Sequence, residues 1–477
     1  MAASDMLTDT WAAPADELLL STFGVRTTEA SPTRIVVIGC GHVGLVMAAG
    51  FAELGHDVVG IDRDEHLVEE LSAGRVRIRE EGLPELAANG LASGRLAFDS
   101  RYSPAVSRAE FIFLAVDTPQ TMAGAADLRN IRSATRSIAE NLNGTSPILV
   151  NKSTSPIGTG ETIEEILRRG MTEVRRIPRI VSNPEFLQQG RAVQDFFHPE
   201  RIVVGSRSRE DAQAVADLYK SLEAPVILTD LRSAEMIKYV ANSFLATRIS
   251  FINEIARLCE QLEIDVDTVV EGVAQDPRIG SHFFRPGIGF GGSCLPKDVA
   301  ALRFIGETLG VSTPVLSAVQ QVNASQRTSA VRRLRARLGS LEGMVIGVWG
   351  LTFKAGTEDT RESPAMDVVQ LLMNDGAIVR LYDPGIVGQP ELVPPHLRRY
   401  LVGSAIDAAR DADALALLTD WPEFREVSLA QVRSVMRGTV LFDGRDHLDR
   451  RVVEENGFAY LGVGRSSTMP RRRRSDR

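Results

Sequence analysis

The chain has 477 residues, 44% of them hydrophobic and 24% charged, a composition typical of a soluble globular protein and unlike a disordered or collagen-like one. At roughly 150 residues per domain, this length predicts about three domains and excludes a single small module. Lys and Arg number 54 against 62 for Asp and Glu, so the net charge is -8 and no broad positive surface for nucleic acid is expected.

The cysteines and the first residues bear on the cellular compartment. Cys40, Cys259 and Cys294 are too few for a disulfide framework and favour a reducing environment. Asp5 and Asp9 are among several acidic residues where a secretion signal would carry basic ones. No stretch approaches the roughly 20 apolar residues of a membrane span. We therefore expect a cytoplasmic protein without a membrane partner.

The pattern of apolar residues predicts an α/β domain over residues 34–230, after a loosely ordered extension at 1–33. A β-branched run, a glycine cluster and a helical periodicity follow one another from Arg34 to Leu54, which predicts strand, tight turn and helix. Further buried strands are predicted at 58–61, 111–116, 148–150, 180–181 and 202–204. Their alternation with helical segments predicts a doubly wound parallel sheet of the Rossmann type.

The second half of the chain predicts a helical middle domain and a second sheet. From Ser233 to Cys259 there is no Gly or Pro and apolar residues recur with helical spacing, so a long central helix is expected to open a middle domain at 231–330. Strand patterns resume at 344–348, 378–381, 414–418 and 440–442. They predict a second Rossmann-like domain at 331–465, followed by a basic disordered tail at 466–477.

The glycine cluster carries the first chemical motif. Gly39, Gly41 and Gly44 fit G-x-G-x-x-G between a strand and a helix, a pattern that places a pyrophosphate at the helix N-terminus. His42 and Val43 complete this cofactor-binding turn, although the His42 side chain is expected to pack rather than to ligate. Asp62 ends the second strand, where a carboxylate accepts hydrogen bonds from the ribose hydroxyls and repels a 2'-phosphate. The motif therefore predicts NAD rather than NADP.

A second motif surrounds the last cysteine. Cys294 follows the glycine-rich run 289–292 and lies close to Lys297, and backbone N–H groups and positive charge both favour a thiolate. We expect Cys294 to be a nucleophile, whereas Cys259 keeps a structural interpretation on the apolar helix face. Lys238 and Asn242 are four residues apart on the long helix and project from one face, where an amine and an amide can hold an oxyanion and a water.

With these residues in place, the chain resembles the UDP-glucose/GDP-mannose dehydrogenase family from about Arg34 to Val463. The matching motifs are the glycine turn with Asp62, 116–119, Lys152-Ser153-Thr154, Asn183-Pro184-Glu185-Phe186-Leu187, Lys238 with Asn242, 289–298, Phe353-Lys354 with 359–361, and Phe442-Asp443-Gly444-Arg445. The resemblance implies a four-electron oxidation of a sugar alcohol to a carboxylate with two NAD+. A thiolate fits that chemistry, because it can carry the aldehyde as a thiohemiacetal and then as a thioester.

The resemblance also implies roles for individual residues. The catalytic group would comprise Cys294 as nucleophile, Lys238 and Asn242 as oxyanion stabilisers, and Asp298, Thr154 and Glu185 in water activation and acid-base work. Thr118, Thr154, Lys297 and Arg361 would join the glycine turn in holding NAD. The substrate group would comprise Glu185, Leu187, Lys238, Asn242, Arg278, Phe283, Arg285, Phe290, Gly291, Lys354 and Arg445. Arg278 would reach across from a second subunit, so a homodimer is expected. No metal ion is expected.

Three alternatives to UDP-glucose oxidation stay open at this point. The 276–280 segment followed by Phe283 favours UDP-glucose, yet the run from Gly291 to Asp298 also occurs among GDP-mannose dehydrogenases, and Ser293 counts against a UDP-N-acetylmannosamine enzyme. A two-electron alcohol dehydrogenase would not need Cys294. A catalytically silent NAD-binding protein would be expected to have lost the cysteine, the lysine or the aspartate, and all three are present.

Overall fold

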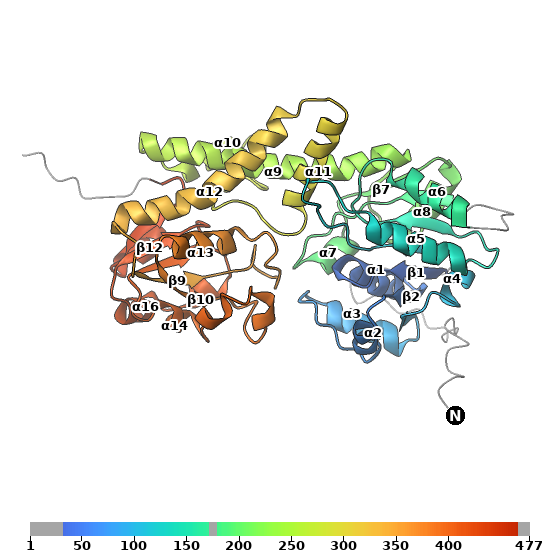
Figure 1. Cartoon of the computed structure of the whole chain (residues 1–477), viewed down its shortest axis with the longest axis horizontal. Helices are drawn as coiled ribbons and strands as arrows, with labels where there is room; N and C mark the ends of the chain where they lie inside the picture. The colour runs from blue at the N-terminus through green and yellow to red at the C-terminus, as the bar shows by residue number, and fades with distance from the viewer. Residues whose placement is uncertain (1–31, 171–178, 466–477) are drawn as a thin grey trace, which may run out of the picture. The chain divides into compact units, whose positions relative to one another are not determined.

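The computed structural model describes residues 32–170 and 179–465, and divides into two compact units, 1–241 and 242–477. One helix, α9 (Leu231–Leu262), runs through the boundary (Figure 1). Almost all of the predicted extension and the whole basic tail lie outside the described residues. The predicted fold class is confirmed, because each unit contains a Rossmann-like sheet and helices lie between the two sheets in the sequence. The predicted domain boundaries stay a prediction.

The first unit is built on an eight-stranded sheet of order β3-β2-β1-β4-β5-β6-β7-β8. All neighbours pair in parallel except β6 and β7, so β7 and β8 run opposite to the other strands. The strand order reverses direction between β1 and β4, which is where doubly wound sheets bind ligands. The strands are β1 (Arg34–Ile38), β2 (Asp57–Ile61), β3 (Leu96–Asp99), β4 (Phe111–Leu114), β5 (Ile148–Asn151), β6 (Arg179–Ser182), β7 (Ile202–Ser206) and β8 (Val226–Thr229).

Helices cover both faces of this sheet because successive residues of a strand point to opposite faces. Ile35 and Val37 pack into one core with α1, α3, α7 and α8, whereas Val36 and Ile38 pack into another with α4, α5 and α6. The helices are α1 (His42–Glu53), α2 (Glu65–Ser72), α3 (Leu83–Ala92), α4 (Ala105–Arg108), α5 (Arg129–Asn141), α6 (Thr159–Gly170), α7 (Ala192–Phe197), α8 (Arg209–Asp217) and the 3-10 turn η1 (Lys220–Leu222).

The second unit contains the rest of α9 and a five-stranded parallel sheet of order β10-β9-β11-β12-β13. The strands are β9 (Val345–Trp349), β10 (Ile378–Tyr382), β11 (Ala414–Leu417), β12 (Val440–Asp443) and β13 (Ala459–Gly462). The helices are α10 (Val266–Ala274), α11 (Leu295–Thr308), α12 (Pro314–Leu338), α13 (Pro364–Asn374), α14 (Ala405–Ala409), α15 (Glu423–Glu426), α16 (Leu429–Val435) and α17 (Arg450–Glu455), with 3-10 turns η2 (Pro390–Leu392) and η3 (Arg398–Tyr400). Among the residues described, no helix is both long and apolar enough to cross a membrane.

A buried carboxylate fixes the start of α9 against the first sheet. Glu235 accepts hydrogen bonds from the backbone N–H groups of Gly158 at 2.7 Å and Gly160 at 2.8 Å, where α6 begins, and from the Ser182 hydroxyl at 3.2 Å. Burial raises the pKa of Glu235 to about 7, although the two N–H groups oppose that shift. Glu235 therefore caps one helix from another and holds the first turns of α9 in place.

Replacement of Glu235 by alanine should destabilise the first unit by about 2 to 3 kcal/mol, because two buried N–H groups lose their acceptor. Chemical denaturation followed by circular dichroism measures this loss. Arg232→Ala on the same helix is the control: its ion pair with Glu161 is largely exposed, so its effect should stay within about 0.5 kcal/mol. Equal effects of the two substitutions would contradict the capping role.

Candidate active site

The glycine turn has the backbone that a dinucleotide requires. Gly39 adopts φ +94°, which L side chains rarely adopt, and a Cβ on Gly44 would collide with the Gly39 carbonyl oxygen. A Cβ on Gly41 would meet nothing within 4 Å. Two of the glycines are thus required by the turn and its packing, while the middle one leaves open space beside the N-terminus of α1 for a phosphate group.

The electrostatics of this turn also suit NAD. No described side chain caps α1, and its first turn carries no acidic residue, so its N–H groups remain able to bind an anion. Asp62 follows β2 and accepts hydrogen bonds from the N–H groups of Cys40 at 2.8 Å and Asp64 at 3.1 Å. A carboxylate held at the end of β2 suits the ribose hydroxyls of an adenosine. The residues present therefore fit the predicted cofactor.

His42 has an additional partner in this region. Its Nε2 lies 2.7 Å from Glu80 Oε2, and the buried Glu80 carboxylate also accepts hydrogen bonds from Gly190 N at 2.8 Å and Ala192 N at 2.6 Å. The His42 side chain is thus held by a buried carboxylate, while Val43 is partly buried against the core of the first sheet. Through Glu80 the glycine turn is connected to the loop that follows Leu187.

Two predicted cofactor residues meet at the ends of β4 and β5. The Thr118 hydroxyl donates to the Thr154 carbonyl oxygen at 2.6 Å, so the loops after these neighbouring strands are held together. Because β1, β4 and β5 are parallel, their carboxyl ends share one edge of the sheet. Thr118, Thr154 and the glycine turn therefore lie on the same edge, where the strand order reverses.

Glu185 and Lys238 form a buried ion pair in the first unit. Lys238 Nζ lies 2.9 Å from Glu185 Oε1, and both side chains are less than one-tenth exposed. The other oxygen of Glu185 accepts a hydrogen bond from Leu187 N at 2.7 Å. Burial raises the pKa of the Glu185 carboxyl, but the Lys238 ammonium, the Leu187 N–H and the charge of Lys152 together outweigh it and leave the pKa below its usual value. Glu185 is thus kept ionised.

The cysteine loop belongs to the second unit. Cys294 is exposed and is the N-cap of α11, at the positive end of the helix dipole. One turn further along α11, the buried Asp298 carboxylate accepts hydrogen bonds from Asn242 Nδ2 at 2.6 Å and Lys297 Nζ at 2.7 Å. Four predicted residues are therefore brought together around the first turn of α11.

Arg445 braces the glycine-rich loop from the end of β12. Its guanidinium donates to the backbone carbonyl oxygens of Gly289 at 2.9 Å, Leu418 at 2.9 Å and Phe353 at 3.2 Å. These three bonds fix the direction of the guanidinium. Gly291 packs tightly beside this loop, because a Cβ there would collide with the Glu362 carbonyl oxygen.

The remaining predicted substrate and cofactor residues differ in exposure. Phe290 is buried in a small core with Ala246 and Val299, so its side chain stabilises the loop. Arg278 is exposed and pairs with Asp276, as Arg361 pairs with Asp359. The others are exposed or partly so: Leu187, Phe283, Arg285 and Lys354.

Three family models match the chain in order: the NAD binding domain of the UDP-glucose/GDP-mannose dehydrogenase family at residues 33–223, its central domain at 232–325 and its UDP binding domain at 347–450. The chain belongs to this family. Together with its relatives, the match makes the protein an NAD-dependent nucleotide-sugar 6-dehydrogenase.

Individual members of the dehydrogenase family match the chain over most of its length. It is 41% identical over 432 residues to the UDP-glucose 6-dehydrogenase TuaD of Bacillus subtilis, covering 91% of this chain and 93% of that one. It is 40% identical to the UDP-glucose 6-dehydrogenase of Pseudomonas aeruginosa, over 91% and 97% of the two chains. The structure of a UDP-glucose dehydrogenase from Pyrobaculum islandicum is 38% identical, with a TM-score of 0.86 over 93% of this chain and 100% of the other.

The sequence analysis missed several residues that hold the predicted ones. Arg248 on α9 donates to the backbone carbonyls of Ile279, Gly280 and His282. Asn323 on α12 accepts from Phe290 N and donates to Phe290 O. These contacts join segments far apart in the chain, and no local pattern marks them; an amide or guanidinium inside an apolar helix face is the one signal that would have drawn attention.

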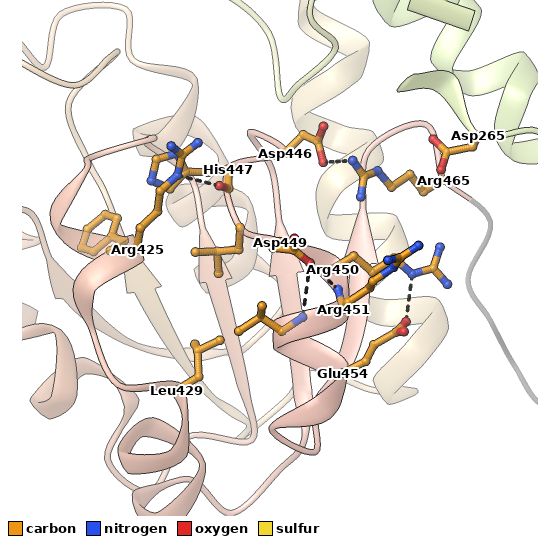
Figure 2. A pocket seen from close by; sticks show the side chains of 13 residues that line it. Asp265, Arg425, Leu429, Asp446, His447, Asp449, Arg450, Arg451, Glu454 and Arg465 are labelled. Atoms are coloured by element: carbon orange, nitrogen blue, oxygen red, sulfur yellow. Dashed lines mark hydrogen bonds and ion pairs between the residues drawn. The ribbon is translucent and has the colours of Figure 1, made fainter. Parts of the chain in front are cut away.

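The second unit of the dehydrogenase also has a cavity of about 870 Å³ (Figure 2), lined by none of the predicted site residues. Its walls come from the segments around α15, the β12 to α17 connection, α17 and the residues after β13. Arg450 pairs with Glu454 and Arg465 with Asp446, while Arg425 donates to the His447 carbonyl oxygen. Three of the arginines that line the cavity are thus held by partners within the second unit.

Asp62→Ala should weaken NAD binding by roughly 10- to 100-fold, because the carboxylate predicted to accept hydrogen bonds from the ribose hydroxyls is lost, and should reduce discrimination against NADP. The two Michaelis constants, measured at saturating sugar nucleotide, give both effects. Glu65→Ala, which removes an exposed carboxylate three residues away, should leave the ratio of the constants unchanged. An unaltered ratio in Asp62→Ala would assign cofactor choice to other residues.

Proposed function

We propose that this dehydrogenase oxidises the C6 alcohol of UDP-glucose to the carboxylate of UDP-glucuronate, through a thiohemiacetal and a thioester on Cys294. The observation that carries the proposal is the setting of Cys294, which is an exposed thiol at the positive end of α11 with Lys297 and Asp298 in the next turn. The substrate is supported by the relatives, because they are named UDP-glucose 6-dehydrogenases.

The glycine turn and Asp62 would hold NAD+, which when bound would supply the hydride acceptor for each oxidation, so the complete reaction would use two. The first oxidation takes a hydride and a proton from the C6 alcohol and leaves an aldehyde. The Cys294 thiolate adds to the aldehyde carbon, and the resulting thiohemiacetal loses a second hydride and its hydroxyl proton to become a thioester. Water then attacks the thioester carbon, which releases the carboxylic acid and the thiol.

The buried charges suit the steps on the cysteine. The amine of Lys238 and the amide of Asn242 would stabilise the oxyanions that develop at C6. Asp298 and Thr154 would position the hydrolytic water, and Glu185, kept ionised by its neighbours, would accept a proton from it. Asp298 is already fixed by two hydrogen bonds, so its direction is set before the substrate arrives.

Binding of the nucleotide sugar is assigned to four segments. Leu187 and the loop from Phe283 to Gly291 would surround the sugar and the base, and Lys354 and Arg445 would meet the phosphates. Arg445 supports this role because its guanidinium is fixed by three hydrogen bonds, and a guanidinium is the side chain that best matches phosphate oxygens.

We also propose that the protein is a homodimer in which α9 meets a second copy. Phe244, Phe251, Leu258 and Leu262 recur at helical spacing along α9 and are each more than half exposed. A row of large apolar side chains on one helix face is a common subunit interface. Arg278, which is exposed, would then contribute to the partner's substrate site. The cytoplasmic location remains an expectation from the reducing environment that the three cysteines favour.

The purified enzyme should form two NADH per UDP-glucose and release UDP-glucuronate, identified by mass. Cys294→Ala should form no acid, because no thioester can form. Cys259→Ala is the matched control, since that buried thiol lies on α9 and should leave the stoichiometry at two. Acid production by Cys294→Ala would refute the mechanism. One NADH per sugar would indicate a simple alcohol dehydrogenase, turnover of GDP-mannose alone would change the substrate, and no turnover of any nucleotide sugar would leave an NAD-binding protein.

Leu258→Glu should convert the dimer into monomers, because it would place a charge within the apolar face of α9. Light scattering coupled to gel filtration measures the mass directly. Gln370→Glu adds the same charge on the exposed surface of α13 and should leave the dimer intact. A dimer that survives Leu258→Glu without loss of stability would place the interface elsewhere.

A further inference from the structure

Lys152, at the end of β5, is a buried lysine that the proposed reaction does not use. Its side chain is 7% exposed, and its Nζ donates to Asn183 Oδ1 at 3.0 Å and to the Tyr219 hydroxyl at 3.3 Å. Among the residues described, these two neutral groups are its hydrogen-bond partners. Lysine is rarely buried without a carboxylate partner, because its charge loses hydration. The arrangement therefore needs an explanation beyond packing.

The two partners of Lys152 are themselves bonded to each other. The Tyr219 hydroxyl donates to Asn183 Oδ1 at 2.8 Å, and burial raises the Tyr219 pKa, so the phenol stays protonated. Asn183 Nδ2 donates to the Val203 carbonyl oxygen at 2.7 Å. Every polar atom of the Asn183 side chain is thus engaged, and its oxygen has two donors, of which only Lys152 carries a charge.

Asn183 starts the segment Asn183-Pro184-Glu185, so whatever fixes Asn183 also fixes the backbone two residues before Glu185. The charges of this region comprise Glu185 and the two lysines on either side of it in the network, Lys152 and Lys238. Burial lowers the pKa of Lys152 to about 7; Glu185 opposes this shift and Lys238 adds to it. In the other direction, the Lys152 charge lowers the pKa of Glu185.

We propose that Lys152 is a positioning residue for the reaction: it anchors Asn183, and with it the segment that carries Glu185, and its positive charge keeps the Glu185 carboxylate ionised beside Lys238. The inference rests on the proposed role of Glu185 in the dehydrogenase. The second cation near the Glu185 carboxylate then comes from the end of β5. It is held by a neutral asparagine and a neutral tyrosine instead of a direct ion pair.

Two substitutions separate the charge from the hydrogen bond. Lys152→Met removes a donor to Asn183 and the charge, whereas Tyr219→Phe removes the other donor and no charge. The dependence of kcat/KM for UDP-glucose on pH is measured for both variants. The acidic limb should move to higher pH by about half to one unit in Lys152→Met, because Glu185 loses a cation that stabilises its ionised form. It should stay in place in Tyr219→Phe.

A third variant guards against misfolding. Lys152→Gln keeps an amide donor for Asn183 while removing the charge, and it should move the limb as Lys152→Met does. NAD affinity, measured by fluorescence titration, reports whether the first unit is intact in each variant. An acidic limb that stays at the wild-type position in folded Lys152→Gln or Lys152→Met would overturn the electrostatic part of the proposal.

A double-mutant cycle of thermal stability tests whether Lys152 and Tyr219 anchor Asn183 together, and it requires no catalytic turnover. Each single variant leaves Asn183 Oδ1 with one donor, and Lys152→Met with Tyr219→Phe leaves it with none, so the double variant should lose more thermal stability than the sum of the two. Additive losses would overturn the shared anchor. If the wild-type protein showed no activity toward UDP-glucose, the proposed function would be refuted. The double-mutant cycle would still decide whether Lys152 helps to anchor Asn183.

Discussion

Two buried carboxylates each fix one side chain of the unbroken helix α9, and the proposed mechanism depends on these two contacts. Lys238 pairs with Glu185 and Asn242 donates to Asp298, and the two are one turn apart on α9. Glu235, one turn before Lys238, fixes the same helix against the N-terminus of α6. A polar group buried at this depth is costly unless its partner is in place. The direction of both side chains is therefore decided by the fold before any ligand binds.

The charges of this region are distributed so that each has a distinct environment. Glu185 is surrounded by cations and an N–H donor and stays ionised, whereas Glu235 meets N–H groups and a hydroxyl, and burial raises its pKa to about 7. Lys152 meets neutral groups and has a pKa lowered to about 7. Environment, more than residue type, thus assigns the protonation state of each group. A site that must stabilise an oxyanion and then activate water requires such differences.

The sequence predicted the parts of the fold that local physics determines. Ten strands follow from short, mostly apolar runs, and α9 extends only a few residues beyond the predicted range because no Gly or Pro interrupts it. Three strands, β3, β8 and β13, were missed. Leu96–Asp99 and Val226–Thr229 are each four residues long and lie at the two edges of the sheet, and Val226–Thr229 is also exposed or partly so. The antiparallel pairing of β6 and β7 depends on tertiary packing and leaves no local signal.

In the candidate site, too, features with a local sequence pattern could be predicted, whereas contacts set by tertiary packing could not. The glycine turn and the cysteine loop could be predicted because their backbones demand glycine at fixed spacings, as Gly39 and Gly44 show. The contacts of Arg445 and Arg248 with backbone carbonyls, and the triangle of Lys152, Asn183 and Tyr219, join segments distant in sequence and could not. The missed residues hold in place the segments that carry the predicted ones.

The proposed mechanism requires a single sulfur atom, that of Cys294, to carry the sugar between the two oxidations. The most direct measurement is mass spectrometry of peptides from enzyme mixed with UDP-glucose and NAD+, quenched with acid within one turnover. We expect a transient adduct with the mass of the uronyl thioester on the peptide that contains Cys294. This adduct should decay as the acid appears. Formation of UDP-glucuronate at the full rate with Cys294 unmodified at every time point would contradict it.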